Sequence, residues 1–251
     1  MKKWIVYLTA ALFPNILWAA DIQATLQWSQ RVELSTPVSG VVQAVNVDVG
    51  DLVKAGQVLL TLDSTAYRAK VAENQSEITR LAAEVEEAKR DLDRVQGLYE
   101  RTVVSTADLD QAKLRVVNSQ SMLAEARARL RLNQNALDET SIRAPFDAVV
   151  VLRQAEPGMS VAAALQPQML LTLARSGEMI ARMHLSSPQM DKLKTGQKVT
   201  VSVSGSNYTG IIKTLGLEPT RIKEDLVYPV DVVFSSGETL RAGAPALVKL
   251  P

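Results

Sequence analysis

The sequence predicts an elongated α+β multidomain protein, in which an antiparallel coiled-coil hairpin interrupts a small β domain and a β-barrel follows. Residues 32–63 and 140–175 are rich in β-branched residues with short-range alternation, a pattern typical of strands. Residues 64–139 between them contain one glycine and follow a seven-residue apolar repeat, which predicts a coiled coil. Residues 176–251 return to several short strand-like runs, and these suit a small barrel.

The first β segment is divided into short strands by turns that contain glycine. These turns are Ser39-Gly40, Val49-Gly50-Asp51 and Ala55-Gly56. Glycine adopts a positive φ without a Cβ clash, so it suits tight turns. We therefore expect Gly40, Gly50 and Gly56 to be structural turn residues, together with Gly158 and Gly243 in the later β segments.

Two apolar series form the helical region. The first is Val71, Ile78, Val85, Leu92 and Tyr99, and the second is Leu109, Val116, Leu123, Leu130 and Leu137. Residues 102–106 separate the series, and Ser105 or Thr106 is suited to begin the second helix as its N-cap. A short break predicts an antiparallel hairpin whose arms, of about 33 residues each, are on the order of 50 Å long. The alternative is one continuous helix that forms a parallel dimer.

The β segment after the hairpin must complete the β domain that the hairpin interrupts. Its two halves, residues 32–63 and 140–175, would then pair across the base of the hairpin. The later strands are expected at Met179–Leu185, Lys198–Val203, Thr209–Leu215, Leu226–Phe234 and Ala246–Leu250, with one short helix near Pro188–Leu193. Several short strands with little helix favour a barrel over residues 176–251.

The composition excludes most catalytic classes. Hydrophobic residues make up 47% of the chain, which is ample for packed cores. The 28 basic and 27 acidic residues leave a net charge of +1, so nothing indicates nucleic acid or an anionic membrane surface as the main partner. Cysteine is absent and His184 is the one histidine, which removes thiol chemistry, disulfides and metal sites of the Cys/His type. With no clustered acid, base or nucleophile, we expect no enzyme and no cofactor.

A group of methionines raises the question of a metal. Met159 and Met183 lie in a methionine-rich stretch, and His184 adjoins Met183. Thioethers together with imidazole favour Cu(I). Methionine is also ordinary core filler in apolar strands, and on that ground we expect no metal site.

The first 20 residues have the pattern of an export signal. Lys2 and Lys3 precede an apolar stretch over residues 5–12, and Leu17-Trp18-Ala19-Ala20 is a small-residue cleavage site. The alternative is an uncleaved membrane anchor, but Pro14 and Asn15 interrupt the apolar run short of the roughly 20 residues that span a bilayer. We expect cleavage after Ala19 or Ala20 and a soluble mature protein in the periplasm.

Three stretches resemble the periplasmic adaptors, or membrane fusion proteins, of tripartite pumps, also called the HlyD-like family. Residues 37–42 with 47–63 resemble the first half of the family's lipoyl-like module, and residues 140–150 with 157–161 resemble the second half, with Ala148 where glycine is usual. Residues 240–246 resemble the signature that closes the adaptor β-barrel, with Ala242 in place of proline. The resemblance implies a lipoyl-like barrel-sandwich hybrid at 32–63 and 140–175, a hairpin at 64–139 and a barrel at 176–251. It also implies a membrane-proximal domain, which we expect to be absent or vestigial here.

This resemblance implies an adaptor that bridges an inner-membrane transporter to a TolC-like outer-membrane channel. An RND-type transporter is the first expectation, and ABC- and MFS-type exporters are the alternatives. The family implies self-association, with six copies in the assembled pump. Lipoyl and biotinyl carriers share the half-motifs, but this chain lacks their lysine motif, and Lys54 and Lys70 do not lie where an acylated lysine is needed.

The hairpin tip carries the most specific expected site. Arg94, Leu98 and Ser105 match in spacing the arginine-leucine-serine motif by which family adaptors resemble one another at the point of channel docking. The resemblance implies that Arg94 and Ser105 donate hydrogen bonds to channel carbonyls. Leu98, just off the seam that Val95 and Tyr99 continue, would fill an apolar notch. The alternative is that Ser105 is only an N-cap and Arg94 only a solvated charge.

Overall fold

A computed structural model describes residues 21–163, 167–223 and 225–250. The expected signal segment, residues 1–20, lies outside the described residues. The chain divides into two compact units. One comprises residues 30–176, and the other combines the residues up to Ser29 with those from Gly177 onward.

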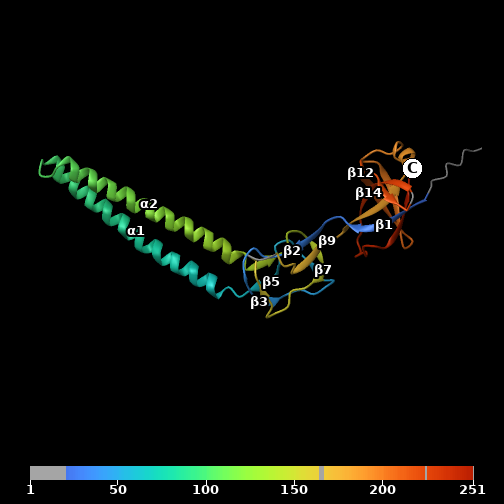
Figure 1. Ribbon diagram of the computed structural model, residues 1–251, viewed down its shortest axis with the longest axis horizontal. Coiled ribbons are helices and arrows are strands. Elements are labelled where there is room, and N and C mark those ends of the chain that lie inside the picture. Colours follow the sequence, from blue (N-terminus) through green and yellow to red (C-terminus); the bar gives the residue numbers. More distant parts are fainter. Residues whose placement is uncertain (1–20, 164–166, 224, 251) are drawn as a thin grey trace, which may run out of the picture. The chain divides into compact units, whose positions relative to one another are not determined.

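Two long helices form an antiparallel hairpin, as the heptad pattern predicts. Helix α1 (Thr65–Glu100) and helix α2 (Thr106–Asp138) lie side by side in Figure 1 and are joined by residues 101–105. The buried seam consists of Leu81, Val85 and Ala88 from α1, and Leu109, Ala112, Val116, Leu123 and Ala126 from α2. The repeat is narrow because each helix buries only the side that faces the other. The alternative of one continuous helix is wrong for this chain.

Two four-stranded antiparallel sheets adjoin the hairpin. The strands before it are β2 (Arg31–Leu34), β3 (Gly40–Val45), β4 (Leu52–Val53) and β5 (Val58–Leu62). Those after it are β6 (Ser141–Arg143), β7 (Ala148–Arg153), β8 (Ser160–Val161) and β9 (Leu171–Arg175). The sheet orders are β2-β9-β7-β4 and β6-β5-β3-β8. Each sheet therefore combines strands from both sides of the hairpin, and the two halves bury one shared apolar core.

The second unit is a closed barrel. Its elements are β1 (Asp21–Trp28), β10 (Glu178–Leu185), α3 (Ser187–Met190), β11 (Lys198–Val203), β12 (Ser206–Leu215), β13 (Thr220–Ile222), β14 (Asp225–Ser235) and β15 (Pro245–Lys249). The sheet order is β10-β1-β15-β11-β12-β14-β13, and β10 also pairs with β14. That last pairing closes the sheet, so β13 is left as an extension that pairs with β14 alone.

Strand β1 is a barrel element that the sequence analysis did not assign. The predicted barrel began at residue 176, whereas β1 pairs with β10 through Ala24–Trp28 and with β15 through Asp21–Thr25. Ala24 and Leu26 point into the barrel core, and Thr25 between them is exposed. The barrel closes through β1, because no pairing joins β10 to β15 directly.

Four of the five glycines expected in turns have a positive φ, and Gly40 does not. Gly50, Gly56, Gly158 and Gly243 have φ values of 99°, 81°, 87° and 86°, which glycine adopts without strain. Gly40 is different, because it lies within β3, pairs with Val161 and has no positive φ. A Cβ on Gly40 would lie 3.5 Å from Leu62, an ordinary van der Waals distance. The turn role expected for Gly40 is therefore wrong.

Candidate functional site: the tip of the helical hairpin

The tip is a tight turn whose backbone groups are bonded within the turn itself. The carbonyl of Leu98 accepts from the amides of Arg101, at 3.2 Å, and Val103, at 3.0 Å. The carbonyl of Tyr99 accepts from the amide of Thr102 at 2.8 Å. Thr102 has a φ of 62°, a left-handed conformation that is unusual for a residue with a Cβ. Because the last carbonyls of α1 find partners in this way, the turn can present its side chains in a fixed arrangement.

Ser105 begins α2 as the N-cap of a complete capping box. Its hydroxyl accepts from the amide of Asp108 at 3.2 Å and donates to Asp108 Oδ2 at 2.6 Å, while the Ser105 amide donates to the same oxygen at 3.0 Å. The hydroxyl has one proton and two lone pairs. The hydroxyl already donates its one proton to Asp108. Ser105 can therefore accept one further hydrogen bond, but it can donate to a partner only if its bond to Asp108 is broken.

Replacing Ser105 with alanine should remove the hydroxyl that holds the pKa of Asp108 below its ordinary value. The backbone amide of Ser105 is the second cause of that lowered pKa. We expect the pKa of Asp108 in Ser105→Ala, followed by NMR titration of the carboxyl carbon, to rise toward its ordinary value. A lowered folded pKa means that the cap stabilises the tip above the unfolded pKa, about 3.9, and that this stability is lost as the pH falls through the folded pKa. An unchanged pKa in Ser105→Ala would contradict the capping role.

Arg94 is held in place by a carboxylate that two guanidinium groups share. Asp91 pairs with Arg94 one turn along α1, and with Arg115 of α2, whose Nη1 lies 2.6 Å from Asp91 Oδ2. Arg94 and Arg115 are both well exposed, whereas the Asp91 side chain is only 19% exposed. One carboxylate between two arginines leaves this group of three side chains with a net charge of +1. The spacing of the motif points to Arg94 but not to Asp91 or Arg115, because the contact of those two joins residues 24 positions apart.

The apolar part of the tip differs from the expectation in one respect. The heptad series places Tyr99 on the buried seam, yet Tyr99 is 40% exposed and Leu98 is half-buried. The seam ends here because α1 ends at Glu100 and α2 begins only at Thr106. Val103, in the turn, is 67% exposed and was not singled out from the sequence. An apolar β-branched residue in a polar turn was the signal that could have found it.

The three expected tip residues occupy two parts of this structure. Asp91, Arg94 and Leu98 follow one another at helical spacing on α1, three and four residues apart, and so share a face of the helix. Ser105 lies beyond the turn at the start of α2. The tip therefore presents a positive charge, apolar side chains and a hydrogen-bond acceptor.

Met183 and His184, two of the residues considered for metal binding, lie on opposite faces of β10. Met183 is fully buried in the barrel core, whereas His184, the next residue on β10, is exposed on the outer face. Met159 packs in the other unit. Over the part of the chain that the structure describes, no group of three or more His, Asp or Glu side chains could hold a metal ion.

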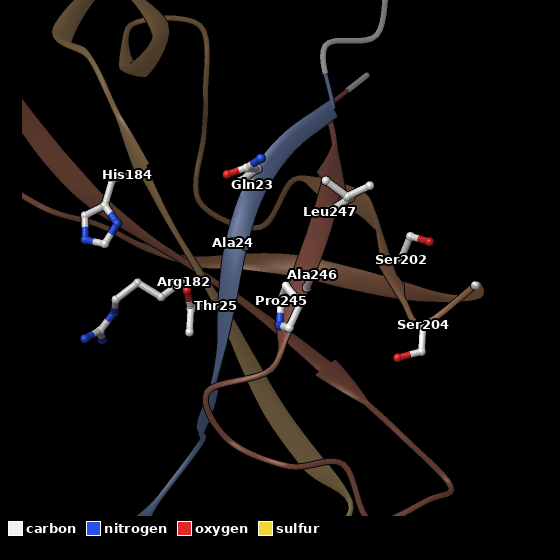
Figure 2. A pocket seen from close by; sticks show the side chains of 11 residues that line it. Gln23, Ala24, Thr25, Arg182, His184, Ser202, Ser204, Pro245, Ala246 and Leu247 are labelled. Atoms are coloured by element: carbon white, nitrogen blue, oxygen red, sulfur yellow. The ribbon is translucent and has the colours of Figure 1, made fainter.

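His184 instead lines an outer groove of the barrel, with a volume of about 580 Å³. Figure 2 shows His184 and Arg182 at one side of this groove, and Ser202 and Ser204 at the other. Arg182 is bound through Nε and Nη2 to the carboxylate of Asp231, at 2.7 and 2.8 Å. That ion pair raises the pKa of Arg182. The groove is lined by both polar and apolar residues, and its arginine is already paired with a carboxylate.

Comparison with known proteins identifies the family. A family model described as the CzcB-like barrel-sandwich hybrid domain matches residues 30–174, more than half of the chain. The chain belongs to this family. The match covers both sheets and the hairpin inserted between their strands, and it bears out the resemblance to membrane fusion proteins drawn from the sequence. Members of this family are not enzymes, in agreement with the expectation from composition.

Curated relatives extend the similarity into the barrel. The macrolide export protein MacA of Yersinia pestis is 31% identical over 231 residues, which cover 85% of this chain and 61% of the relative. The multidrug resistance protein MdtA of Cronobacter turicensis is 30% identical over 137 residues, or 55% of this chain and 33% of the relative. The chain thus spans about three fifths of the length of MacA and one third of the length of MdtA.

A solved structure supports the fold. The membrane fusion protein Spr0693 from Streptococcus pneumoniae R6 matches with a TM-score of 0.73 and 16% sequence identity, over 92% of this chain and 98% of that one. At this identity the likeness concerns the fold alone. Among the residues that the structure describes, no helix combines the length and the apolar character needed to cross a membrane.

Proposed function

We propose that this chain is the periplasmic adaptor subunit of a tripartite efflux pump, which joins an inner-membrane transporter to a TolC-like outer-membrane channel. The observation that carries the proposal is the hairpin itself. Its 36- and 33-residue helices span on the order of 50 Å and end in a turn with exposed docking groups. A rod of this kind suits a bridge between two partners, and in this proposal the chain performs no chemistry of its own.

Docking to the channel would use the groups that the tip leaves available. Arg94 has guanidinium N–H groups that are not bonded to Asp91, and Leu98 and Val103 offer apolar surface. Ser105 would accept a hydrogen bond, since its hydroxyl already donates to Asp108. A small interface of this kind can bind tightly when a few of its side chains are well packed in the complex and are already ordered before binding.

The cargo and the transporter class are the finer parts of the proposal. The names of MacA and MdtA point to export of macrolides and other drugs, so we propose small-molecule efflux. An RND-type transporter remains the partner expected from the sequence, with several copies of the adaptor around it. The chain would reach the periplasm through the export signal at residues 1–20. Crosslinking in cells followed by mass spectrometry of the captured membrane protein tells an RND transporter from an ABC or MFS exporter.

Replacing Leu98 with aspartate should abolish crosslinking of the hairpin tip to the channel and pump-dependent drug tolerance. The added charge would have to be desolvated against an apolar notch. Gln96→Asp is the matched control, because residue 96 is exposed on the same turn of α1 but points roughly to the opposite side of the helix. Circular dichroism should show both variants as helical as the parent. If neither Leu98→Asp nor Ser105→Asp changed tolerance or crosslinking, the channel-docking role would be overturned.

A further inference from the structure

The outer groove of the barrel, which His184 lines, crosses four neighbouring strands, β10, β1, β15 and β11. Paired residues on adjacent strands point to the same face of a sheet, so the pairings show which side chains lie next to one another in the groove. Thr25 of β1 is paired with both Arg182 of β10 and Pro245 of β15. These three side chains form one row across the groove.

A second row of side chains lies beside the first. Leu247 of β15 is paired with both Gln23 of β1 and Ser202 of β11. His184, two residues after Arg182 on β10, extends this row. Each of the four strands has a partner on both of its edges in the closed barrel. The backbone therefore holds the groups that line the groove in fixed positions.

Short side chains form the middle of the groove. Figure 2 shows Thr25 and Pro245 there, with Arg182 and His184 to one side. The other side includes the turn between β11 and β12, where Ser204 has a φ of 48°, as in a tight two-residue hairpin turn. The volume of about 580 Å³ falls within the range of small-molecule sites, roughly 300–1,000 Å³.

The groove has no free charge that would favour an ion. Arg182 is the one Lys, Arg, Asp or Glu among the described residues that line it. Its guanidinium is bonded to Asp231 of β14, which adjoins β10 on the edge opposite β1, and Figure 2 shows the side chain extending away from Thr25. Arg182 therefore presents mainly its apolar stem to the groove. The groove offers an anion no unpaired cation and a cation no carboxylate, so it suits a neutral ligand.

The uncharged polar groups of the groove are available for hydrogen bonds. Each can both donate and accept, and all are exposed or half-exposed; they belong to Gln23, Thr25, His184, Ser202 and Ser204. Within the described part of the chain, the side-chain hydrogen bonds at this groove are the two from Arg182 to Asp231. Leu247, 39% exposed, and Pro245 add apolar surface between these groups. A complementary ligand has hydroxyl or carbonyl oxygens on an apolar frame.

We propose that this groove is a binding site for a neutral amphiphilic small molecule, one with several hydroxyl or carbonyl oxygens on a rigid apolar frame. The ligand lies across β1 and β15, with its frame on Pro245 and Leu247. Its oxygens bond to Gln23 and His184 at one side and to Ser202 at the other. The inference goes beyond the proposed function, because the groove belongs to the barrel and the docking tip belongs to the other unit.

Three probes separate the two requirements of the site, and isothermal titration calorimetry on the purified exported protein measures their binding. Digoxigenin is a neutral hydroxylated steroid, cholate is an anionic hydroxylated steroid, and maltotriose is a neutral polyol without a rigid apolar frame. We expect digoxigenin to bind at one site. Cholate should bind at least about tenfold more weakly, because its carboxylate would lose water without gaining a free cation. Maltotriose should also bind at least about tenfold more weakly, because it buries little apolar surface.

Methyl NMR locates the bound probe. Digoxigenin should shift the methyl signals of Leu247, which lines the groove. The methyl signals of Leu132, which is more exposed, at 70%, but lies in the helical hairpin, should not move.

Two variants of the groove test the assignment of its residues. Thr25→Tyr fills the middle of the groove and should weaken digoxigenin binding at least about tenfold, since the ligand can no longer lie across β1. Thr209→Tyr is the matched control, because Thr209 is an exposed strand residue of β12 outside the groove, and its affinity should equal that of the parent. Ser202→Ala removes one hydrogen bond without adding bulk and should weaken binding by about 2- to 12-fold.

Four results would each overturn the proposal. They are no saturable binding of digoxigenin, equal or tighter binding of cholate or maltotriose, unmoved Leu247 signals, and full affinity in both Thr25→Tyr and Ser202→Ala. Crosslinking of the hairpin tip to the channel tests the adaptor function separately. If that crosslinking persisted while digoxigenin failed to bind, the groove would not be a ligand site and the adaptor function would stand.

Discussion

Replacing Leu123 with aspartate should unfold the helical hairpin. Leu123 is 8% exposed and packs with Leu81, Val85 and Ala126 in the cluster that joins the two helices. Truncating a buried leucine costs about 2–5 kcal/mol, and a carboxylate in the same place adds the cost of desolvating a charge without a partner. We expect a loss of at least about 3 kcal/mol in the free energy of unfolding. Far-UV circular dichroism during urea titration measures it as an earlier loss of helix signal.

Leu132→Asp is the matched control for this prediction. It introduces the same charge into the same helix, but Leu132 is 70% exposed and, nine residues after Leu123, points away from α1. We expect its free energy of unfolding to remain within about 0.5 kcal/mol of the parent's, as for ordinary surface substitutions. Equal destabilisation by both variants would mean that the seam is not where the heptads and the structure locate it.

The hairpin could be predicted from sequence because its signals are local. A seven-residue repeat, the lack of proline and a break with an N-cap residue all lie within the segment that they describe. The predicted start of the second helix at Ser105 or Thr106 agrees with α2, whose N-cap is Ser105. Only the end of the seam at Tyr99 was misplaced, because α1 ends one residue later and α2 begins at Thr106, so neither helix continues far enough to cover this side chain.

The pairing of strands depends on contacts far apart in sequence, and there the prediction was incomplete. The alternation in Asp21–Trp28 indicates a strand, yet nothing local says that this strand completes a barrel whose other members begin at residue 178. Gly40 was misassigned for a related reason. A glycine after serine suggests a turn, but Gly40 pairs with Val161, which lies 121 residues later.

The tip shows the same division between local and distant contacts. The spacing of Arg94, Leu98 and Ser105 was visible in the sequence, and so was the capacity of Ser105 to act as an N-cap. The pairing of Asp91 with both Arg94 and Arg115 was not visible in the sequence, because the Asp91–Arg115 contact joins two helices. The capping box also revised the expected chemistry of Ser105 from hydrogen-bond donor to acceptor, since its hydroxyl already donates to Asp108.

Replacing Phe234 with alanine should be the most damaging truncation in the barrel. Phe234 is 2% exposed on β14, pairs across the sheet with Met179 of β10 and Gly210 of β12, and lies 5.3 Å from the ring of Tyr208 between centroids. A buried phenylalanine truncated to alanine costs about 3–5 kcal/mol. Chemical denaturation followed by near-UV circular dichroism would show a lower midpoint, with a slope unchanged if the transition remains two-state.

The surroundings of Gly210 explain why the barrel cannot fill the space that this truncation leaves. A Cβ at Gly210 would approach Val232 to 2.5 Å and Val201 to 2.9 Å, so β12 is already in close contact with its neighbours. Because the closed barrel restrains movement of β10 and β12 toward each other, most of the cavity should remain and its full cost should be measured. The control is Ile211→Ala, one residue further on β12, where the side chain is 46% exposed and truncation should cost less than about 1 kcal/mol. A Phe234→Ala variant as stable as Ile211→Ala would show that β14 does not supply the centre of the barrel core.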